Sequence, residues 1–352
     1  MKPPFLSICI PTYNRLDIIK NNIEKLLSYE GQDIEVVVTD NQSTDGTIQY
    51  LETITDPRFR FVVNEVNIGA ARNFIASIFN GNGKYILYCN DRDLVLTEHL
   101  PQLIQMLHED EYSYVITNND SVTRSGQINR YRKGYEALRA IPIEAHNTGN
   151  IYNGDMIRKY LKLEEFYPYA DTLFGEKFVS RVLATMEKIA YFDYATYRNG
   201  GSKVNREELV SGHVTNEKVK ADEEFYFHPK LSWYMVKAVW TQVFDKHLLE
   251  LTEEQENDYI QYLMDFMIGR ITDYRKYRNM EGYRIHYNLS EHKVSVWEAI
   301  TLGREYISLM KDFLKEHAPQ EAYQTFCRRI PKHWLFIYET LILQKINELR
   351  GR

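Results

Sequence analysis

The sequence predicts an α/β fold, with a mostly parallel sheet flanked by helices, followed by an all-helical domain. Two observations support this class. Apolar runs of strand length alternate with helical patterns up to about residue 100, and from about residue 215 onward the pattern is helical alone. Strands that alternate with helices are typical of βα units, whose strands pair in parallel. With 352 residues, the chain has room for one such domain and a second unit.

Each element of the first part is predicted by a local pattern. Helices are predicted where apolar residues recur at helical spacing. Strands are predicted where short apolar runs end in polar or turn-forming residues. In chain order we expect a strand over Phe5–Ile10, a helix over Leu16–Leu27, a strand over Glu35–Asp40, a helix over Ile48–Ile54, a strand over Phe59–Val63, a helix over Ala70–Phe79, a strand from Tyr85, a helix through Phe178–Met186 and a strand over Ile189–Phe192.

Polar residues follow the ends of the first four predicted strands. Thr12, Asp40, Asn67 and Asp91 each come shortly after such an end. In open sheets of this class, ligands bind beyond the carboxyl ends of the strands. The sequence therefore predicts one binding site at this edge of the sheet.

Two aspartates, Asp91 and Asp93, follow the fourth predicted strand with one residue between them. Residues two apart in extended backbone point the same way, so we expect both carboxylates to face one ligand. Carboxylate oxygens suit Mg²⁺ or Mn²⁺, which also binds diphosphate. Taken alone, the pair fits a solvated acidic turn better than a metal site.

The combination of four motifs is more specific than any one of them. Ile10–Arg15, Asp40–Thr47, Asn67–Gly69 with Arg72 and Asn73, and Asp91–Asp93 occur in this order, each next to a predicted strand. Together they resemble the family 2 glycosyltransferases, which have the Rossmann-like GT-A fold. The resemblance is strong over the first third of the chain and looser to about Ser202.

The resemblance implies an inverting transfer of a sugar from a nucleotide diphosphate sugar to an acceptor hydroxyl. It assigns nucleotide-sugar binding to Pro11, Thr12, Tyr13, Asn14, Asp40, Asn67, Arg72, Asp91, Arg92 and Arg198, and metal binding to Asp91 and Asp93. Asp40 would accept a hydrogen bond from the base, which is uridine in most of the family. A divalent cation, Mn²⁺ or Mg²⁺, would neutralise the leaving diphosphate.

Several of these residues also have a purely structural interpretation. Asn14 could cap a helix, Gly46 and Gly69 could serve turns, and Arg72 could pair with a surface acid. We interpret Asp45 as a helix cap.

Two positions depart from the family pattern. Arg92 stands where many relatives have an acidic or small residue; it either pairs with diphosphate or a carboxylate, or faces solvent. Arg198 is expected to meet phosphate, but Gly200 and Gly201 stand where relatives often have a histidine, so a histidine metal ligand is not expected.

An inverting transfer needs a base that deprotonates the acceptor hydroxyl. The family pattern places it before a helix in the second half of the domain, and Asp171 is the best match. The alternative is that Asp171 is the N-cap of that helix. Glu164, Glu165 and Glu176 are the other candidates.

The expected domains are a catalytic domain over residues 1–214, with a nucleotide-sugar half (1–100) and an acceptor half (101–214), and a helical domain over residues 215–352. The coil-rich insert Asn118–Asn150 is either an acceptor-side loop or a solvated basic stretch. Four apolar stripes are predicted to form the helical core. They are Trp233, Val236, Trp240, Val243 and Phe244; Ile260, Leu263, Met267 and Ile271; Leu302, Tyr306, Leu309 and Phe313; and Leu335, Tyr338, Ile342, Ile346 and Leu349.

The end of the chain is basic and aromatic. Residues 325–352 contain six Lys or Arg and two Glu, together with Trp334, Phe336 and Tyr338. This pattern fits an interfacial helix on anionic lipid, and equally a helix packed on its own domain or on a second subunit.

Composition places the chain in the cytoplasm, where nucleotide sugars are made. The formal net charge of -6 does not indicate nucleic acid binding, and the three cysteines form no disulfide framework. The N-terminus has no apolar run of signal-peptide or membrane-span length. We expect a cytoplasmic enzyme, either free or peripheral at the inner face of the cell membrane, with a nucleotide-sugar donor and a glycan, lipid-linked or glycoprotein acceptor. The alternative is a non-catalytic nucleotide-sugar-binding scaffold of a glycan-assembly complex.

Overall fold

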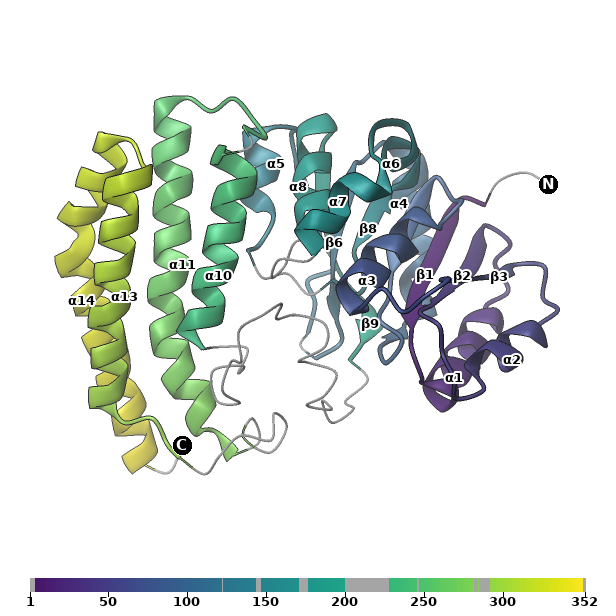
Figure 1. Cartoon of the computed structure of the whole chain (residues 1–352), viewed down its shortest axis with the longest axis horizontal. Helices are drawn as coiled ribbons and strands as arrows, with labels where there is room; N and C mark the ends of the chain where they lie inside the picture. The colour runs from purple at the N-terminus through teal and green to yellow at the C-terminus, as the bar shows by residue number, and fades with distance from the viewer. Residues whose placement is uncertain are drawn as a thin grey trace. The chain divides into compact units, whose positions relative to one another are not determined.

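The computed structural model describes residues 4–121, 123–143, 147–170, 177–199, 228–245, 247–281, 284 and 292–350, and of residues 168–170, 177 and 178 only the backbone. The chain divides into two units, Met1–Thr215 and Asn216–Arg352. Figure 1 labels the helices and strands of both units.

The first half of the sheet is parallel, as predicted. β1 (Leu6–Thr12) pairs with β2 (Ile34–Asp40) on one side and β4 (Tyr85–Tyr88) on the other, and β2 pairs with β3 (Phe59–Val63). In register, Thr12 lies opposite Asp40, and Asp40 lies opposite Val63. The carboxyl ends of three neighbouring strands therefore meet at one edge.

The second half makes the sheet mixed. The nine strands follow the order β3-β2-β1-β4-β8-β6-β9-β5, and β7 pairs with β9. β8 (Ile151–Asn153) is antiparallel to β4 and to β6 (Tyr114–Asn119), while β6 is parallel to β9 (Ile189–Arg198). β5 (Leu94–Val95) and β7 (Ile128–Tyr131) are both antiparallel to β9.

The insert Asn118–Asn150 is mainly coil, as predicted, and also contains two short regular elements. It contains β7 and α5 (Tyr135–Ala140), and Arg130 donates to the hydroxyl of Tyr112 at 2.8 Å. Pairing with β9 orders β7 within this insert, while most of its described residues lie outside helices and strands.

Helices cover both faces of this sheet. Alternate residues of the central strands, such as Ile8, Val36 and Leu87, share one buried cluster with α1 (Leu16–Leu27), α2 (Thr47–Glu52) and α4 (Leu100–Glu109). On the other face lies α3 (Ala70–Phe79), where the ring centroids of Phe74 and Tyr88 are 4.0 Å apart. The remaining elements of the first unit are η1 (Thr97–His99), α6 (Gly154–Tyr160), α7 (Leu163–Ala170) and α8 (Lys177–Met186).

The second unit is helical, as predicted. α10 (Pro229–Trp240) continues into the π-helical turn η2 (Thr241–Asp245), and α11 (Glu253–Asn279), α13 (Val296–His317) and α14 (Gln320–Leu349) run alongside one another (Figure 1). α11 and α13 each begin with a reciprocal capping box, Thr252 with Gln255 and Ser295 with Glu298. In the described part of the chain, no helix combines the length and apolarity that a membrane span requires.

The predicted core stripes hold for α10 and α11 but not for α14. Ile260, Leu263, Met267 and Ile271 are all buried. On α14 the predicted stripe is mainly exposed, and the buried residues are instead Ala322, Phe326, His333, Ile337 and Leu341. The prediction was wrong because α14 has apolar residues on two sides, and α11 and α13 pack against the side that carries Phe326, Ile337 and Leu341. On α13, Leu309 is likewise exposed.

Candidate active site

The carboxyl end of β2 holds a buried carboxylate. Asp40 is 0% exposed, and its Oδ1 accepts a hydrogen bond from the backbone N–H of Ser43 at 2.8 Å. Its Oδ2 is also buried and has no hydrogen-bond partner among the described residues. A carboxylate oxygen is only an acceptor, so this atom is suited to receive an N–H or O–H from a ligand.

A cluster of asparagines forms the rim next to Asp40. Asn41 donates to Oδ1 of Asn67 at 2.7 Å and accepts from Asn64 at 2.9 Å and from the backbone of Ile68 at 3.0 Å. Asn67 also accepts a hydrogen bond from the backbone N–H of Gly69. Gly69 has a positive φ of 83° and is the N-cap residue of α3. These bonds fix the loop between β3 and α3.

Arg72 lies in the first turn of α3. Its guanidinium is 5.3 Å from the centre of the Tyr167 ring, a cation–π contact that orients it.

The loop after β1 is tied to the loop after β2. Asn14, at a positive φ of 51°, accepts from the N–H of Thr44 at 2.7 Å, and its own N–H donates to Ser43 Oγ at 2.8 Å. Asp45 accepts from the first N–H of α1, that of Leu16, at 3.0 Å and from the N–H of Thr47 at 3.1 Å. The interpretation of Asp45 as a cap is confirmed, and it caps two helices. Pro11 is part of β1, and Tyr13 is exposed beside it.

Asp91 and Asp93 lie in a tight turn and not in extended backbone. β4 ends at Tyr88, and the N–H of Asp93 donates to the carbonyl of Asn90 at 3.0 Å. The argument from strand alternation was therefore wrong for this pair. A turn reverses the chain over these residues, so the direction of each side chain is set by its own contacts.

The two carboxylates are held by different groups. Asp91 accepts from Thr12 Oγ1 at 3.1 Å and from Arg15 at 3.2 Å. Asp93 accepts from Thr148 Oγ1 at 2.6 Å and from the side chain of Asn90 at 3.2 Å. Asp91 is thus linked to the end of β1, and Asp93 to the segment before β8.

Three residues of this site were missed by the sequence analysis: Arg15 as a partner of Asp91, Thr148 and Asn22. Asn22 is buried on α1, and its amide donates to the carbonyl oxygens of both Asp91 and Asp93, the latter at 2.8 Å. The available signal was an asparagine within the apolar stripe Ile19, Ile23 and Leu26. Such a polar residue in the buried face of a helix needs a partner.

The environment of Asp91 favours a nearby cation. Burial raises the pKa of Asp91, while the charge of Arg15, the hydrogen bond from Thr12 and the charge of Arg92 oppose that rise. A carboxylate that burial keeps from water gains more from a bound cation than a solvated one does.

The turn supplies two carboxylates as candidate metal ligands. Among the described residues, no group of three or more His, Cys, Asp or Glu side chains could hold a metal ion. Two carboxylates still suit Mg²⁺, which is commonly bound by one or two carboxylates together with substrate phosphates.

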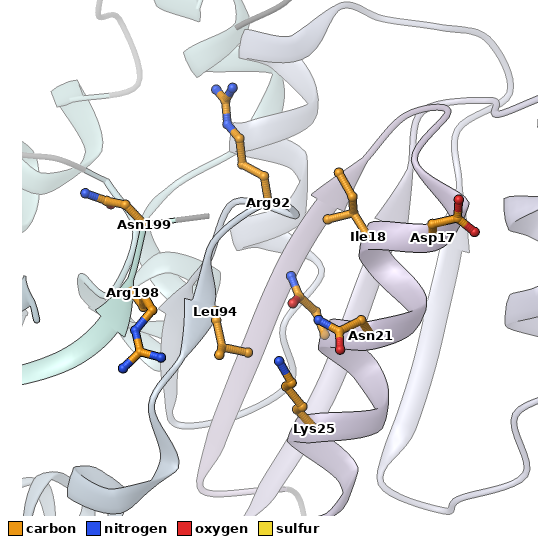
Figure 2. A pocket seen from close by; sticks show the side chains of 9 residues that line it. Asp17, Ile18, Asn21, Lys25, Arg92, Leu94, Arg198 and Asn199 are labelled. Atoms are coloured by element: carbon orange, nitrogen blue, oxygen red, sulfur yellow. The ribbon is translucent and has the colours of Figure 1, made fainter. Parts of the chain in front are cut away.

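A cavity of about 510 Å³ lies between α1 and the turn that carries Arg92. It is lined by Asp17, Ile18, Asn21, Asn22, Lys25, Arg92, Leu94, Arg198 and Asn199. In Figure 2 the α1 side chains form one wall and Arg198 and Asn199 the other, with Arg92 and Leu94 between them. Arg198 is also bound to Asp120, with 2.5 Å between Nε and Oδ2.

The candidate base lies outside the described residues. This holds for Asp171 and Glu176, and also for Gly200 and Gly201. Glu164 and Glu165 are described in the first turn of α7 and are exposed.

Comparison with known proteins identifies the family. The family model described as Glycosyl transferase family 2 matches residues 7–183, which is half of the chain. The chain therefore belongs to glycosyl transferase family 2, and the family predicted from the sequence is confirmed.

Individual relatives match the N-terminal part. Abequosyltransferase RfbV of Salmonella typhimurium is 30% identical over 122 residues, which cover 33% of this chain and 36% of RfbV. Succinoglycan biosynthesis protein ExoO of Rhizobium meliloti is 32% identical over 140 residues, or 39% of this chain and 40% of ExoO. The chain thus spans less than half the length of either relative.

A solved structure shares the fold. The crystal structure of S. aureus TarS 1-349 in complex with UDP-GlcNAc has a TM-score of 0.55 and 15% sequence identity, and covers 99% of this chain and 92% of that chain. The predicted GT-A fold with a C-terminal helical region is confirmed.

Proposed function

We propose that the chain is an inverting glycosyltransferase that moves a sugar from a nucleotide diphosphate sugar, UDP-linked, to an acceptor hydroxyl in bacterial polysaccharide or glycoprotein glycan assembly. The observation that carries the proposal is the buried Oδ2 of Asp40, which has no partner among the described residues. It lies beside Thr12 at the edge where nucleotides bind in such sheets. An imide N–H of uracil is a donor of the kind that this oxygen lacks.

The nucleotide would be enclosed by the residues at this edge. Pro11, Thr12, Tyr13 and Asn14 line the nucleoside on one side, and Asn67 and Arg72 close the other. The hydrogen bonds of Asn67 and the ring contact of Arg72 hold both side chains in place before the donor binds. Less ordering entropy is then lost on binding.

Asp91 and Asp93 would hold Mn²⁺ or Mg²⁺ together with the diphosphate. When bound, the cation supplies positive charge that stabilises the leaving diphosphate. Thr12, Arg15, Thr148 and Asn22 fix the turn, so that both carboxylates are oriented before the donor arrives. We assign further contacts with the diphosphate to Arg92 and Arg198.

Asp171 is the proposed general base. Replacing it with asparagine should leave donor binding intact and abolish transfer, because an amide cannot accept the proton of the acceptor hydroxyl. A normal transfer rate in Asp171→Asn would move the role to Glu164, Glu165 or Glu176.

The first test measures binding of UDP, GDP and dTDP, each with and without Mn²⁺, by thermal shift and calorimetry. Asp40→Asn should weaken binding of the preferred nucleotide by roughly 5- to 100-fold, since an amide cannot satisfy the base N–H in the same way. Asp33→Asn is the matched control, because Asp33 is exposed and directly precedes the first residue of the same strand, at the end opposite Asp40. Equal losses in both variants would contradict the assignment of Asp40.

A second experiment separates the enzyme from a nucleotide-sugar-binding scaffold. Asp93→Ala should abolish metal-dependent donor turnover and leave the fold intact. If the wild-type protein binds the donor but neither hydrolyses nor transfers it with a broad acceptor panel, the scaffold alternative is correct.

The proposal assigns donor binding to residues 1–100, acceptor binding to residues 101–214, and contact with a membrane or a second subunit to the helical domain, residues 215–352. The acceptor is a glycan, lipid-linked or carried by a glycoprotein. The enzyme acts in the cytoplasm, at the inner face of the cell membrane, where donor and lipid-linked acceptor meet.

A further inference from the structure

α14 carries a stripe of exposed apolar side chains. Leu335 is 58% exposed, Tyr338 40%, Ile342 55% and Leu349 77%, and Ile346 is partly exposed between the last two. The spacing of three or four residues places all five on one side of the helix. Phe336 (47%) and Leu343 (59%) widen the patch.

The opposite side of α14 holds it in the second unit. Phe326, Ile337 and Leu341 are buried there, and Arg275 of α11 binds Glu348 of α14 at 2.8 Å. Because α14 is already anchored by this side, the exposed stripe is not needed to keep the helix in the unit. Large apolar side chains gathered in water are costly, and such patches commonly mark contact sites.

The charges around the stripe are mostly positive. Between residues 325 and 350 the helix has five Lys or Arg and two Glu, although the whole chain has a net charge of -6. Arg329 is bound to Asp265 at 2.6 Å, and Glu348 is bound to Arg275, so these two charges are compensated within the unit. Lys345 also forms an ion pair with Glu348, at 3.4 Å. The remaining cations are Arg328, Lys332 and Arg350, with Glu339 as the remaining acid.

The cations flank the stripe. Arg328 lies two turns before Leu335 on the same side of the helix, and Lys345 lies two turns after Tyr338. Lys332 precedes Leu335 by less than one turn, and Arg350 follows Leu349 directly.

We propose that α14 is a membrane-contact helix that lies along an anionic lipid surface. The stripe enters the boundary between headgroups and acyl chains, and the flanking cations contact lipid phosphates. The positive charge around the stripe favours an anionic lipid surface over a second copy of the chain. Pairing two α14 stripes would bring two cationic rims together, whereas an anionic surface neutralises each of them.

The test is flotation of the whole chain with vesicles of phosphatidylcholine alone and of phosphatidylcholine mixed with phosphatidylglycerol, at low and high ionic strength. We expect binding to the mixed vesicles, weakened by salt, and little binding to the neutral ones. Equal binding to both vesicle types would overturn the electrostatic part of the proposal, and binding to neither would overturn all of it.

Two variants with matched controls locate the surface. Leu335→Ser with Ile342→Ser and Leu349→Ser should abolish flotation, whereas Tyr160→Ser, at an exposed apolar residue of α6, should not change it. Lys332→Glu with Arg350→Glu should lower partition onto anionic vesicles at least about 20-fold. Lys311→Glu with Lys315→Glu, on the exposed part of α13, is its control.

Self-association is measured in parallel by light scattering, and folding by circular dichroism, so neither readout depends on catalysis. A wild-type oligomer that becomes monomeric in the triple serine variant, with no flotation in the wild type, would assign the stripe to a second copy instead. Loss of flotation in a control variant as large as in its partner would show that the effect is not specific to α14.

Discussion

Replacing Asn22 with leucine tests whether α1 holds the turn that carries the two aspartates. The side-chain amide of Asn22 donates to the carbonyl oxygens of Asp91 and Asp93, and the residue is 5% exposed. Leucine has a similar volume but no donor. Both carbonyl oxygens then lose this bond in a place that water hardly reaches.

The expected cost follows from these contacts. A buried polar group left without its partner costs about 1–3 kcal/mol. The carbonyl of Asp93 keeps a weak contact with the thiol of Cys89 at 3.4 Å, so its loss is the smaller one. We expect a destabilisation of about 2–4 kcal/mol, a large part of the roughly 5–15 kcal/mol that stabilises a typical domain.

The assay is urea unfolding, together with calorimetry of UDP binding with Mn²⁺ at a temperature where the variant remains folded. Asn21→Leu is the control, because the neighbouring Asn21 is exposed and should change stability by less than about 0.5 kcal/mol. We also expect weaker binding of UDP with Mn²⁺ in Asn22→Leu alone. If both variants unfold at the wild-type midpoint and bind equally well, Asn22 does not hold the turn.

Three further predictions concern stability and are measured by urea unfolding. Asp45→Ala should cost about 1–2 kcal/mol, because Asp45 caps both α1 and α2; an unchanged midpoint would contradict this. Gly149→Ala should be more destabilising than Gly134→Ala. Both have a positive φ (87° and 89°), but a Cβ at Gly149 would lie 2.4 Å from Thr117 Oγ1, while one at Gly134 meets nothing within 4 Å. His333→Leu should remove part of the acid sensitivity between about pH 7 and 5. Burial lowers the pKa of His333, with the charge of Arg329 adding to this and that of Asp265 opposing it, so the unfolded chain binds a proton at higher pH than the folded one. Wild-type stability then falls as the pH drops through this range, and an equal fall in the variant would refute the assignment.

The edge of the sheet was predictable because its signals are local. The apolar run Phe5–Ile10 and the run that ends at Asp40 predict two strands, and in the structure the first extends to Thr12, in register with Asp40. The glycine and capping residues between Asp40 and Thr47 mark the start of α2 within a few residues. The predicted bounds of β3 and α3 agree with the structure residue by residue.

The support of Asp91 and Asp93 was not predictable in the same way, because it comes from distant parts of the chain. Thr148 lies 55 residues from Asp93, and Asn22 lies 69 residues from Asp91. The turn itself depends on these contacts as well as on local sequence. A pattern of two aspartates therefore indicated a ligand site but gave the wrong backbone geometry.

The stripe on α14 shows a different limit of sequence patterns. Periodicity detects that apolar residues share one side of a helix, and both Leu335 with Ile342 and Phe326 with Ile337 satisfy it. Both pairs consist of large apolar residues, yet only the second pair is buried. Charge separates the two sides better than size does. The exposed stripe is flanked by Arg328 and Lys332, for which no ion pair with a described residue is found. The charges near the buried side, Arg329 and Glu348, are paired with α11. An apolar stripe flanked by cations for which no ion pair with a described residue is found is therefore better interpreted as a surface for an anionic partner than as a core.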